Sequence, residues 1–346
     1  MVNNRKSTLK DVAIKAGVST GSVSRYINKD PSLSMRMSED IEQAMRDLYY
    51  TPNMIAQRLA KGRSNVIQLY VFHEDPAVST SWVNELVLMQ SISMYLRDTQ
   101  YTLQIAFDSY LEVNNSINFL RDCIKGKNID GVLIFSSWNI NRELIEMLQE
   151  EEFPFVLVRT RNPVSPNNEV YFDYQNVYSE LVERLYKKGH RNFAFFGGYQ
   201  NRRRTADRYE GFSKACEKLG LPLRKEWIKY GNYSMESGSE FYSELGTLSE
   251  KPTAIICGND TIAAGVVKAA NAANESHLIE VTGFGDMDIA KLLSPPITTV
   301  KVSSIEIGRT AIKMLLDIIS RNECLFKSVS LPCEICHPEN WDRVQI

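Results

Sequence analysis

The sequence has little cysteine and histidine and no long apolar run. Six Cys and four His occur among 346 residues, so no disulfide framework is indicated and histidine-based catalysis has few candidates. No apolar stretch approaches the ~20 residues that span a bilayer. The first ten residues are polar, unlike the apolar segment of a signal peptide. These absences lead us to expect a cytoplasmic protein that is not an enzyme and needs no cofactor or metal.

Charge is unevenly distributed along the chain. Residues 1–63 contain 11 Lys and Arg against 6 Asp and Glu, whereas the remainder contains 29 basic and 36 acidic residues. A basic segment on an acidic body indicates that the segment binds a polyanion. A solvated charged surface stays open as the simpler explanation. The length of 346 residues favours two or three domains over one core.

Residues 8–50 predict three short helices. Thr8 is a good N-cap for a first helix that Gly17 ends, and Ser19 caps a second helix after a very short turn. Two helices joined so tightly are the helix-turn-helix pattern. Residues 38–50 predict a third helix that closes a small core with the other two. We therefore expect residues 1–50 to form a helix-turn-helix domain.

Residues 51–63 predict a linker that contains a short helix. Pro52 disfavours helix at the residue before it, and MIAQRLA follows as a good helix former. About two turns of helix are marginal in isolation. Such a segment is typical of one that folds on binding.

Two stretches, TLKDVAIKAGVSTGSVSRYIN and YTPNMIAQRLAKGRS, resemble the N-terminal signature of the LacI/GalR family of ligand-responsive transcriptional repressors. The resemblance implies a second helix in the major groove of DNA and a hinge helix in the minor groove. Leu59 would wedge between base steps there, with ordinary packing as the alternative. Arg25 would bond a guanine, the commonest specific contact. Gly21 departs from the family, because most relatives carry a side chain there.

The full set of DNA contacts that the resemblance implies combines base and phosphate contacts. We expect it to comprise Thr8, Ser19, Thr20, Gly21, Ser22, Ser24, Arg25, Asn28, Ser34, Asn53, Ala56 and Leu59.

From residue 66 onward, apolar strand patterns alternate with helical ones. Buried strands separated by helices predict parallel sheets, and the series occurs twice, which predicts an α/β core of two subdomains with a crevice between them. This arrangement resembles the periplasmic-binding-protein-like core of the same family. We expect the core at 64–346, with an N-subdomain at 64–162 and 302–328 and a C-subdomain at 163–301 and 329–346.

Ligands bind beyond the carboxyl ends of strands in open α/β sheets. Family register and strand-end position together imply effector contacts by Phe72, Trp138, Arg159, Arg208, Tyr233, Asn259 and Asp286. Local structure is the alternative for each, because an Asn-Asp pair after a strand is also a good helix cap. Arg159 and Gly285 stand where some relatives carry acidic residues. This favours an acidic or phosphorylated effector slightly over a neutral sugar.

Two further motifs have simpler explanations. Cys333, Cys336 and His337 have the C-x-x-C-H spacing of haem attachment, but strand alternation that places Leu331, Cys333 and Ile335 on one face accounts for them. The segment GGYQNRRRTADR at 197–208 lacks the Gly-Lys-Ser/Thr of a phosphate loop. We interpret its arginines as a solvated loop that leads to Arg208.

Together these observations predict a transcription repressor that binds a pseudo-palindromic double-stranded DNA operator as a homodimer. A small-molecule effector, most simply a sugar or sugar derivative, would bind between the core subdomains, and we expect no membrane partner. No leucine heptads follow the last strand, which favours a dimer over a tetramer. The alternative is a carbohydrate-binding or carbohydrate-processing protein with the same crevice fold. Residues 1–63 favour the repressor over this alternative, because a carbohydrate-binding or carbohydrate-processing protein has no need of a basic helix-turn-helix.

Overall fold

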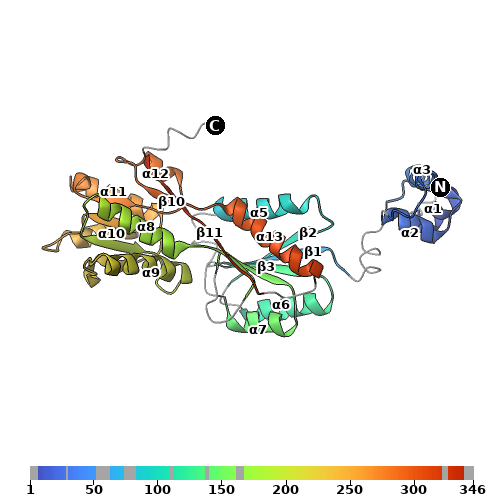
Figure 1. The fold of residues 1–346 in the computed structure, drawn as a ribbon, viewed down its shortest axis with the longest axis horizontal. Coiled ribbons are helices and arrows are strands. Elements are labelled where there is room, and N and C mark those ends of the chain that lie inside the picture. The colour runs from blue at the N-terminus through green and yellow to red at the C-terminus, as the bar shows by residue number, and fades with distance from the viewer. Residues whose placement is uncertain are drawn as a thin grey trace, which may run out of the picture. The chain divides into compact units, whose positions relative to one another are not determined.

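A computed structural model of the chain describes residues 7–28, 30–51, 63–73, 83–109, 113–136, 140–160, 167–321 and 326–338. The chain divides into two compact units, Met1–Ser64 and Asn65–Ile346 (Figure 1). Below, these units are called the head and the core. The predicted hinge helix, with Asn53, Ala56 and Leu59, and the predicted effector residue Trp138 lie outside the described residues.

The first helix of the head begins and ends at the predicted residues, and the second begins where predicted. They are α1, Leu9–Ala16, and α2, Thr20–Ile27. Thr8 caps α1 in a capping box, Gly17 ends it in the left-handed conformation at φ 65°, and the Ser19 hydroxyl accepts the N–H of Ser22. The helix-turn-helix geometry thus follows from local cap chemistry.

The third helix, α3, spans Met35–Asp47 and starts three residues before the predicted 38–50. The predicted start was wrong because Ser34 is the N-cap and accepts the N–H of Met37. A small apolar core joins the three helices, and its fully buried members are Val12, Ala13, Val23, Ile41 and Ala44.

The first sheet of the core has six parallel strands in the order β11-β5-β4-β3-β1-β2. The strands are β1 Val66–His73, β2 Thr102–Ser109, β3 Gly131–Ser136, β4 Phe155–Val158, β5 Glu169–Phe172 and β11 Ser328–Leu331. Helices α5, Val83–Leu96, and α13, Ser304–Arg321, cover one face (Figure 1). Helices α6, Val113–Lys125, and α7, Arg142–Glu150, cover the other.

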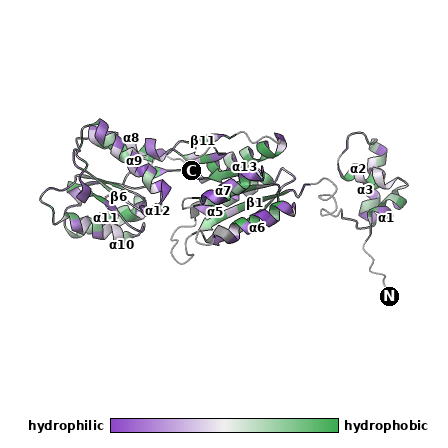
Figure 2. Ribbon diagram, turned by 90° about the horizontal axis from the view of Figure 1, so that it is seen from below, coloured by the Kyte–Doolittle hydropathy of each residue, from purple (hydrophilic) through white to green (hydrophobic). Residues whose placement is uncertain are grey.

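The second sheet has parallel strands in the order β7-β6-β8-β9. The strands are β6 Phe193–Gly197, β7 Ile228–Tyr230, β8 Ala254–Cys257 and β9 Glu280–Thr282. The helices around it are α8 Tyr174–Lys187, α9 Arg203–Lys218, α10 Met235–Leu245, α11 Asp260–Ala272 and the short α12 Asp288–Leu292, with 3₁₀ turns η2 Lys225–Trp227 and η3 Ser276–Leu278. Hydropathy follows this layering, with apolar residues in the strands and on the inner helix faces (Figure 2).

Side chains of one strand alternate between the two faces of this sheet. Phe193 and Phe195 of β6 pack into the apolar cluster that includes α8 and α9, whereas Ala194 and Phe196 pack into the cluster of α10 and α11. Burial on both faces explains why the strands read as continuous apolar runs in the sequence.

The chain passes between the sheets after β5, again before α13, and once more after β11. The predicted N-subdomain segments end at residues 162 and 328. β5 lies wholly beyond the first bound and β11 mostly beyond the second, yet both strands pair in the first sheet. A short antiparallel pair, β10 Thr299–Lys301 and β12 Glu334–Cys336, forms a separate ladder. The segment 331–335 is therefore not one strand as predicted, because β11 ends at Leu331 and β12 begins at Glu334.

Candidate functional sites

The exposed face of α2 carries side chains that the fold itself does not use. Thr20, Ser24 and Arg25 are exposed, and within the described residues none of the three has a side-chain hydrogen bond or ion pair. The opposite face buries Val23 completely. Arg25 stands in the last turn. A cation and two hydroxyls on one open helix face are groups that hydrogen-bond to bases and phosphates.

The other predicted DNA contacts in the head already make hydrogen bonds. The Thr8 hydroxyl donates to Asp11, Asn28 donates its amide N–H to the Ser24 carbonyl, and Ser19 and Ser34 cap helices. These four residues are exposed, as is Gly21. Ser22 is buried, with its hydroxyl 3.0 Å from that of Ser19.

In the core, Arg208 on α9 is held by aromatic rings and one carbonyl. Its guanidinium lies 4.0 Å from the Phe284 ring centroid and 4.9 Å from that of Tyr174, and Nη1 donates to the Gly258 carbonyl at 2.9 Å. The residue is 5% exposed, and Nε has no hydrogen-bond partner in the described structure. Arg208 makes no ion pair with a described residue. A buried, positively charged group therefore lies between strand ends without a counterion.

Arg159 follows β4 directly and is also 5% exposed. Its φ of 59° is left-handed, which is uncommon for a residue other than Gly and often marks functional positions. Nη1 lies 3.6 Å from the Glu85 carboxylate, yet neither Nε nor Nη1 has a hydrogen-bond partner among the described residues. The guanidinium also faces the Phe135 ring at 5.7 Å.

The arginine-rich segment before Arg208 is not a solvated loop as predicted. Arg203 and Arg204 form the first turn of α9, and Arg202 is its N-cap residue. Arg202 is 7% exposed and stacks on the Tyr199 ring at 4.3 Å. Sequence reasoning missed these groups, although the four-residue spacing of Arg204 and Arg208 places both on one helix face.

Electrostatics links the arginines across the two sheets. Burial lowers the pKa of Arg204, and the positive charges of Arg159 and Arg208 lower it further. Arg159 and Arg208, predicted from separate strand ends, thus each lie close enough to Arg204 to affect its pKa. Effector contact by either residue stays a prediction.

Tyr233 and Asn259 lie beside Arg208 but serve the fold. The Tyr233 hydroxyl bonds Thr205 at 2.8 Å, and its ring packs directly on Gly198, where a Cβ would lie 1.9 Å from the ring. Asn259 caps α11 by accepting the Ile262 N–H, and its amide N–H donates to the Tyr233 carbonyl. The cap alternative for Asn259 is confirmed; effector contact by either residue stays a prediction.

Two acidic residues follow the ends of β8 and β9. Asp286 lies within 4.0 Å of Lys291 and Lys301. Asp260 is fully buried, accepts the Thr299 hydroxyl and the Met287 N–H, and burial raises its pKa to about 6. A Cβ on Gly283 would lie 2.0 Å from the Asp260 carboxylate, so this close approach requires glycine.

Phe72 is a core residue in the structure. It is 3% exposed and packs in the cluster of α6 and α7, with its ring 4.9 Å from Tyr70. Arg159 lies over Phe135, which belongs to the other cluster of this sheet. Phe72 is thus not brought together with the arginines.

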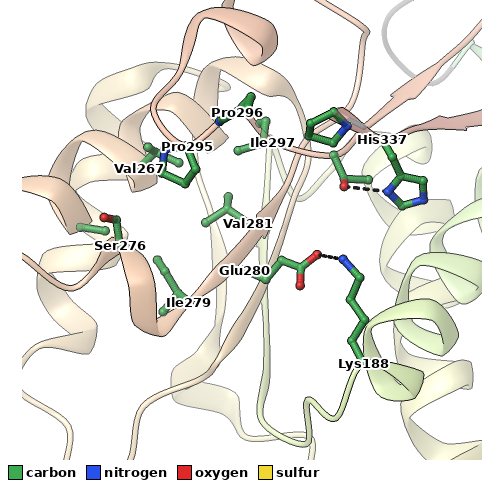
Figure 3. Close-up of a pocket in the computed structure, with 13 residues that line it drawn as sticks. Lys188, Val267, Ser276, Ile279, Glu280, Val281, Pro295, Pro296, Ile297 and His337 are labelled. Carbon is green, nitrogen blue, oxygen red and sulfur yellow. Dashed lines mark hydrogen bonds and ion pairs between the residues drawn. The ribbon is translucent and has the colours of Figure 1, made fainter. Parts of the chain in front are cut away.

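None of the predicted effector residues lines a cavity of about 390 Å³, whose lining residues Figure 3 shows. Apolar side chains of α11, β9 and the segment 295–297 form most of its wall. Its charged wall is already paired: Lys188 donates to Glu280 at 2.6 Å, and His337 bonds Thr298. The hydrogen bonds of Glu280 to His190 and Lys188 lower its pKa to about 2. This cavity offers space but no unpaired charge.

Two searches over the described ranges gave negative results. None of the helices there combines the length and the apolarity that crossing a bilayer requires. In the same ranges, no three His, Cys, Asp or Glu side chains are placed to hold a metal ion.

Two family models match this chain. The model of bacterial regulatory proteins of the lacI family matches residues 8–53, and that of a periplasmic binding protein-like domain matches residues 182–337. The first covers α1 to α3, and the second covers the second sheet and α9, the helix that carries Arg208. The chain belongs to the LacI family.

Full-length relatives support this membership. The LacI-family chain is 28% identical to catabolite control protein A of Priestia megaterium over 332 residues, which cover 95% of this chain and 97% of the relative. It is also 28% identical to the transcriptional repressor PurR of Actinobacillus pleuropneumoniae over 338 residues, 96% of each. The LacI-family chain is a DNA-binding transcriptional regulator with a ligand-binding core.

Solved structures share the fold. The lac repressor dimer bound to operator and the anti-inducer ONPF has a TM-score of 0.80 at 22% identity, covering 96% of this chain and 98% of that one. A regulatory protein of the LacI family from Chloroflexus aggregans has a TM-score of 0.71 at 27% identity, and the match covers 79% of this chain and 96% of that one.

Proposed function

We propose that this LacI-family protein is a repressor that binds a pseudo-palindromic operator as a homodimer and is controlled by a small molecule in its core. The observation that carries the proposal is the open face of α2, where Thr20, Ser24 and Arg25 have no role in the fold. In a basic helix-turn-helix, such a face is the element that enters the major groove. The predicted hinge contacts Asn53, Ala56 and Leu59 belong to the same proposal.

Base reading falls mainly on Thr20 and Arg25. Arg25 has the planar pair of donors that matches guanine O6 and N7. Gly21 offers no side chain, so DNA shape and the hinge supply more of the specificity. Ser22 contributes through the cap with Ser19, since its hydroxyl is buried.

The effector site of the proposal lies around Arg208, at the carboxyl ends of β4, β8 and β9. Parallel sheets bind ligands at this edge. The proposal is supported by Arg159, Asn259 and Asp286, which follow the carboxyl ends of β4, β8 and β9 in the chain. A ligand that contacts both sheets would favour one arrangement of the subdomains. Operator affinity would change if that arrangement also favours the folded hinge.

Dimer formation is supported by apolar side chains on one part of the core. Helix α5 packs on α13 yet leaves Leu86, Met94 and Tyr95 exposed, and the edge strand β2 exposes Ile105 and Phe107. Exposed apolar groups on neighbouring elements are typical of an association surface. Two-fold association also matches a palindromic operator. The relatives are transcriptional regulators, so we expect no catalytic activity.

A gel-shift titration of the full chain on the DNA upstream of its own gene, at several salt concentrations, tests the proposal. We expect a shifted complex whose affinity falls steeply with salt, because phosphate contacts release counterions. A shift that is absent or insensitive to salt would contradict it. Sedimentation of the unbound protein should show a dimer.

A further inference from the structure

Asp260 is a fully buried carboxyl group at the start of α11. It makes no ion pair with a described residue; its two oxygens accept the Thr299 hydroxyl at 2.5 Å and the Met287 N–H at 2.7 Å. Burying an ionised carboxylate without a cation is costly. The site therefore favours the protonated form of Asp260.

The hydrogen bonds of Asp260 tie α11 to two segments that come later in the chain. One is the loop 283–287 after β9, to which Asp260 also donates its backbone N–H, at the Phe284 carbonyl, over 3.0 Å. The other is the strand β10. Loop and strand are joined directly as well, because Gly285 donates its N–H to the Val300 carbonyl at 2.8 Å. Asp260 thus fixes one side of a continuous hydrogen-bonded unit.

This unit connects the proposed effector site with a crossing between the subdomains. The loop contains Asp286, and the Phe284 ring lies 4.0 Å from the Arg208 guanidinium. The strand β10 leads into α13, which packs on strands of the first sheet. A hydrogen bond from β10 to Asp260 therefore holds a crossing segment against the second sheet.

A protonated Asp260 keeps both side-chain hydrogen bonds and removes the buried charge. A backbone N–H can only donate, so the oxygen that faces Met287 must remain an acceptor. A hydroxyl can donate or accept, so a proton on the other oxygen can be donated to Thr299. Burial accordingly raises the pKa of Asp260 to about 6. Asparagine has the same pattern of one acceptor and one donor, without titrating.

The groups around Asp260 do not neutralise a negative charge there. The negative charge of Asp286 raises the pKa of Asp260 further. Burial raises the pKa values of the neighbouring thiol and phenol, so both are neutral near pH 7. The titratable surroundings are Asp286 with its ion-pair partners Lys291 and Lys301, together with Cys257 and Tyr178.

We propose that Asp260 is a proton-sensitive positioning residue, whose carboxyl group holds the loop 283–287 and β10 in place and thereby sets operator affinity. Protonated by solvent, Asp260 keeps both segments in the arrangement of the structure. Ionised, it favours an arrangement that hydrates the carboxylate, and the loop and β10 loosen together. This inference rests on the proposed function, because an effect on DNA requires that the core control the head.

Amide hydrogen exchange of the full chain without DNA tests the positioning role. At pH 7.5, Asp260→Asn should slow exchange in 283–287 and 298–301 by about threefold or more, because the amide keeps both hydrogen bonds without the charge. Asp260→Ala removes both bonds and should speed exchange there. Thr299→Val removes only the hydroxyl and should also speed exchange, so the test stays decisive if Asp260→Ala does not fold.

Asp317→Asn is the matched control for this measurement. Asp317 is exposed on α13, and its carboxylate has no hydrogen bond or ion pair with a described residue. This variant should exchange like the wild type. At pH 5 the wild type should approach Asp260→Asn, because its own carboxyl group is then protonated. Equal exchange of the wild type, Asp260→Asn and Thr299→Val at pH 7.5 would overturn the proposal.

Operator affinity supplies a pH profile that a merely structural role would not produce. The probe is a fluorescein-labelled fragment of the DNA upstream of the gene, titrated with each protein from pH 5 to pH 8 at constant salt. The Kd of the wild type divided by that of Asp260→Asn should change by about threefold or more, with a midpoint near pH 6. The same ratio for Asp317→Asn should stay constant. Taking ratios removes the pH effects that the head has in both proteins.

The two measurements separate this inference from the function on which it rests. Slower exchange in Asp260→Asn with no operator complex at any pH would support the positioning role and overturn the proposed function. A salt-dependent operator complex whose Kd ratio stays constant from pH 5 to pH 8 would keep the proposed function and overturn the proton-sensitive role of Asp260.

Discussion

The head and the core both present arginine, but they hold it differently. Arg25 in the head is exposed on a short helix and lacks ion pairs with described residues. Arg208 in the core is 5% exposed and fixed between the Phe284 and Tyr174 rings. An exposed arginine can adjust to base edges on docking, whereas a buried one is ordered before its ligand arrives. The difference suits a long, continuous DNA ligand in one case and a small molecule in the other.

The two units also differ in how much core supports them. Among the described residues of the head, five buried apolar side chains join the three helices, while large apolar clusters line both faces of each core sheet. All four Trp, at positions 82, 138, 227 and 341, belong to the core unit. Tryptophan fluorescence therefore reports on the core alone, and operator binding reports on the head.

The largest effect is expected from Ile41→Ala. Ile41 is fully buried in the head, and removing its side chain should cost about 2–5 kcal/mol, enough to unfold so small a unit. Operator binding should disappear while the urea midpoint from tryptophan fluorescence stays unchanged. Ile14→Ala is the control, because Ile14 is 70% exposed on α1. Loss of both readouts in Ile41→Ala would show that head and core unfold as one.

Asp260 should make the stability of the core depend on pH. Burial raises its pKa from 3.8 to about 6, so between these values the folded state keeps a proton that the unfolded state has released. The stabilisation is present below pH 3.8 and is lost as pH rises through about 6. Its contribution to the free energy of unfolding is at most about 3 kcal/mol. Urea unfolding followed by tryptophan fluorescence measures it at each pH.

Asp260→Asn provides the reference for that measurement, because its amide does not titrate. The unfolding free energy of the wild type minus that of the variant should decrease from pH 4 to pH 7. A constant difference across this range would contradict the raised pKa. Asp260→Asn should leave the head unaffected, so the urea concentration at which operator binding is half lost should equal that of the wild type.

Arg25→Ala should relax operator preference and cost about 1–3 kcal/mol of specific binding. The reason is the loss of a bidentate contact to guanine, which random DNA does not supply. Competition between operator and random DNA in gel shifts measures the preference. Arg36→Ala removes the same charge from exposed α3 and should weaken both kinds of DNA alike. If Arg25→Ala keeps its preference for operator, α2 is not the reading helix.

The smallest effect is expected from Gly21→Ala. An added Cβ would lie 3.5 Å from the Ser19 hydroxyl, an ordinary contact, and Ala stabilises a helix by up to about 1 kcal/mol relative to Gly. Amide hydrogen exchange in α2 should slow while operator binding is retained. Gly17→Ala is the contrasting variant, because φ at Gly17 is 65° and Ala is strained there. Faster amide hydrogen exchange in α2 of Gly21→Ala would contradict the conclusion that this position has room for a Cβ.

The sequence by itself determined the head and the alternation of strands and helices. Cap residues such as Thr8, Gly17 and Ser19 act on their immediate neighbours, so both ends of α1 and the start of α2 were predictable to the residue. The apolar runs from residue 66 onward predicted strands for the same local reason, and the family signature at 8–53 is likewise contiguous.

Tertiary structure alone decided which of these groups meet. Pairing of β5 and β11 joins residues 159 positions apart, and no local pattern encodes that partnership. Tertiary packing also made Phe72 a core residue and buried Arg202 at the start of α9. Cap and strand signals depend on neighbours in sequence, whereas burial and charge clustering depend on neighbours in space.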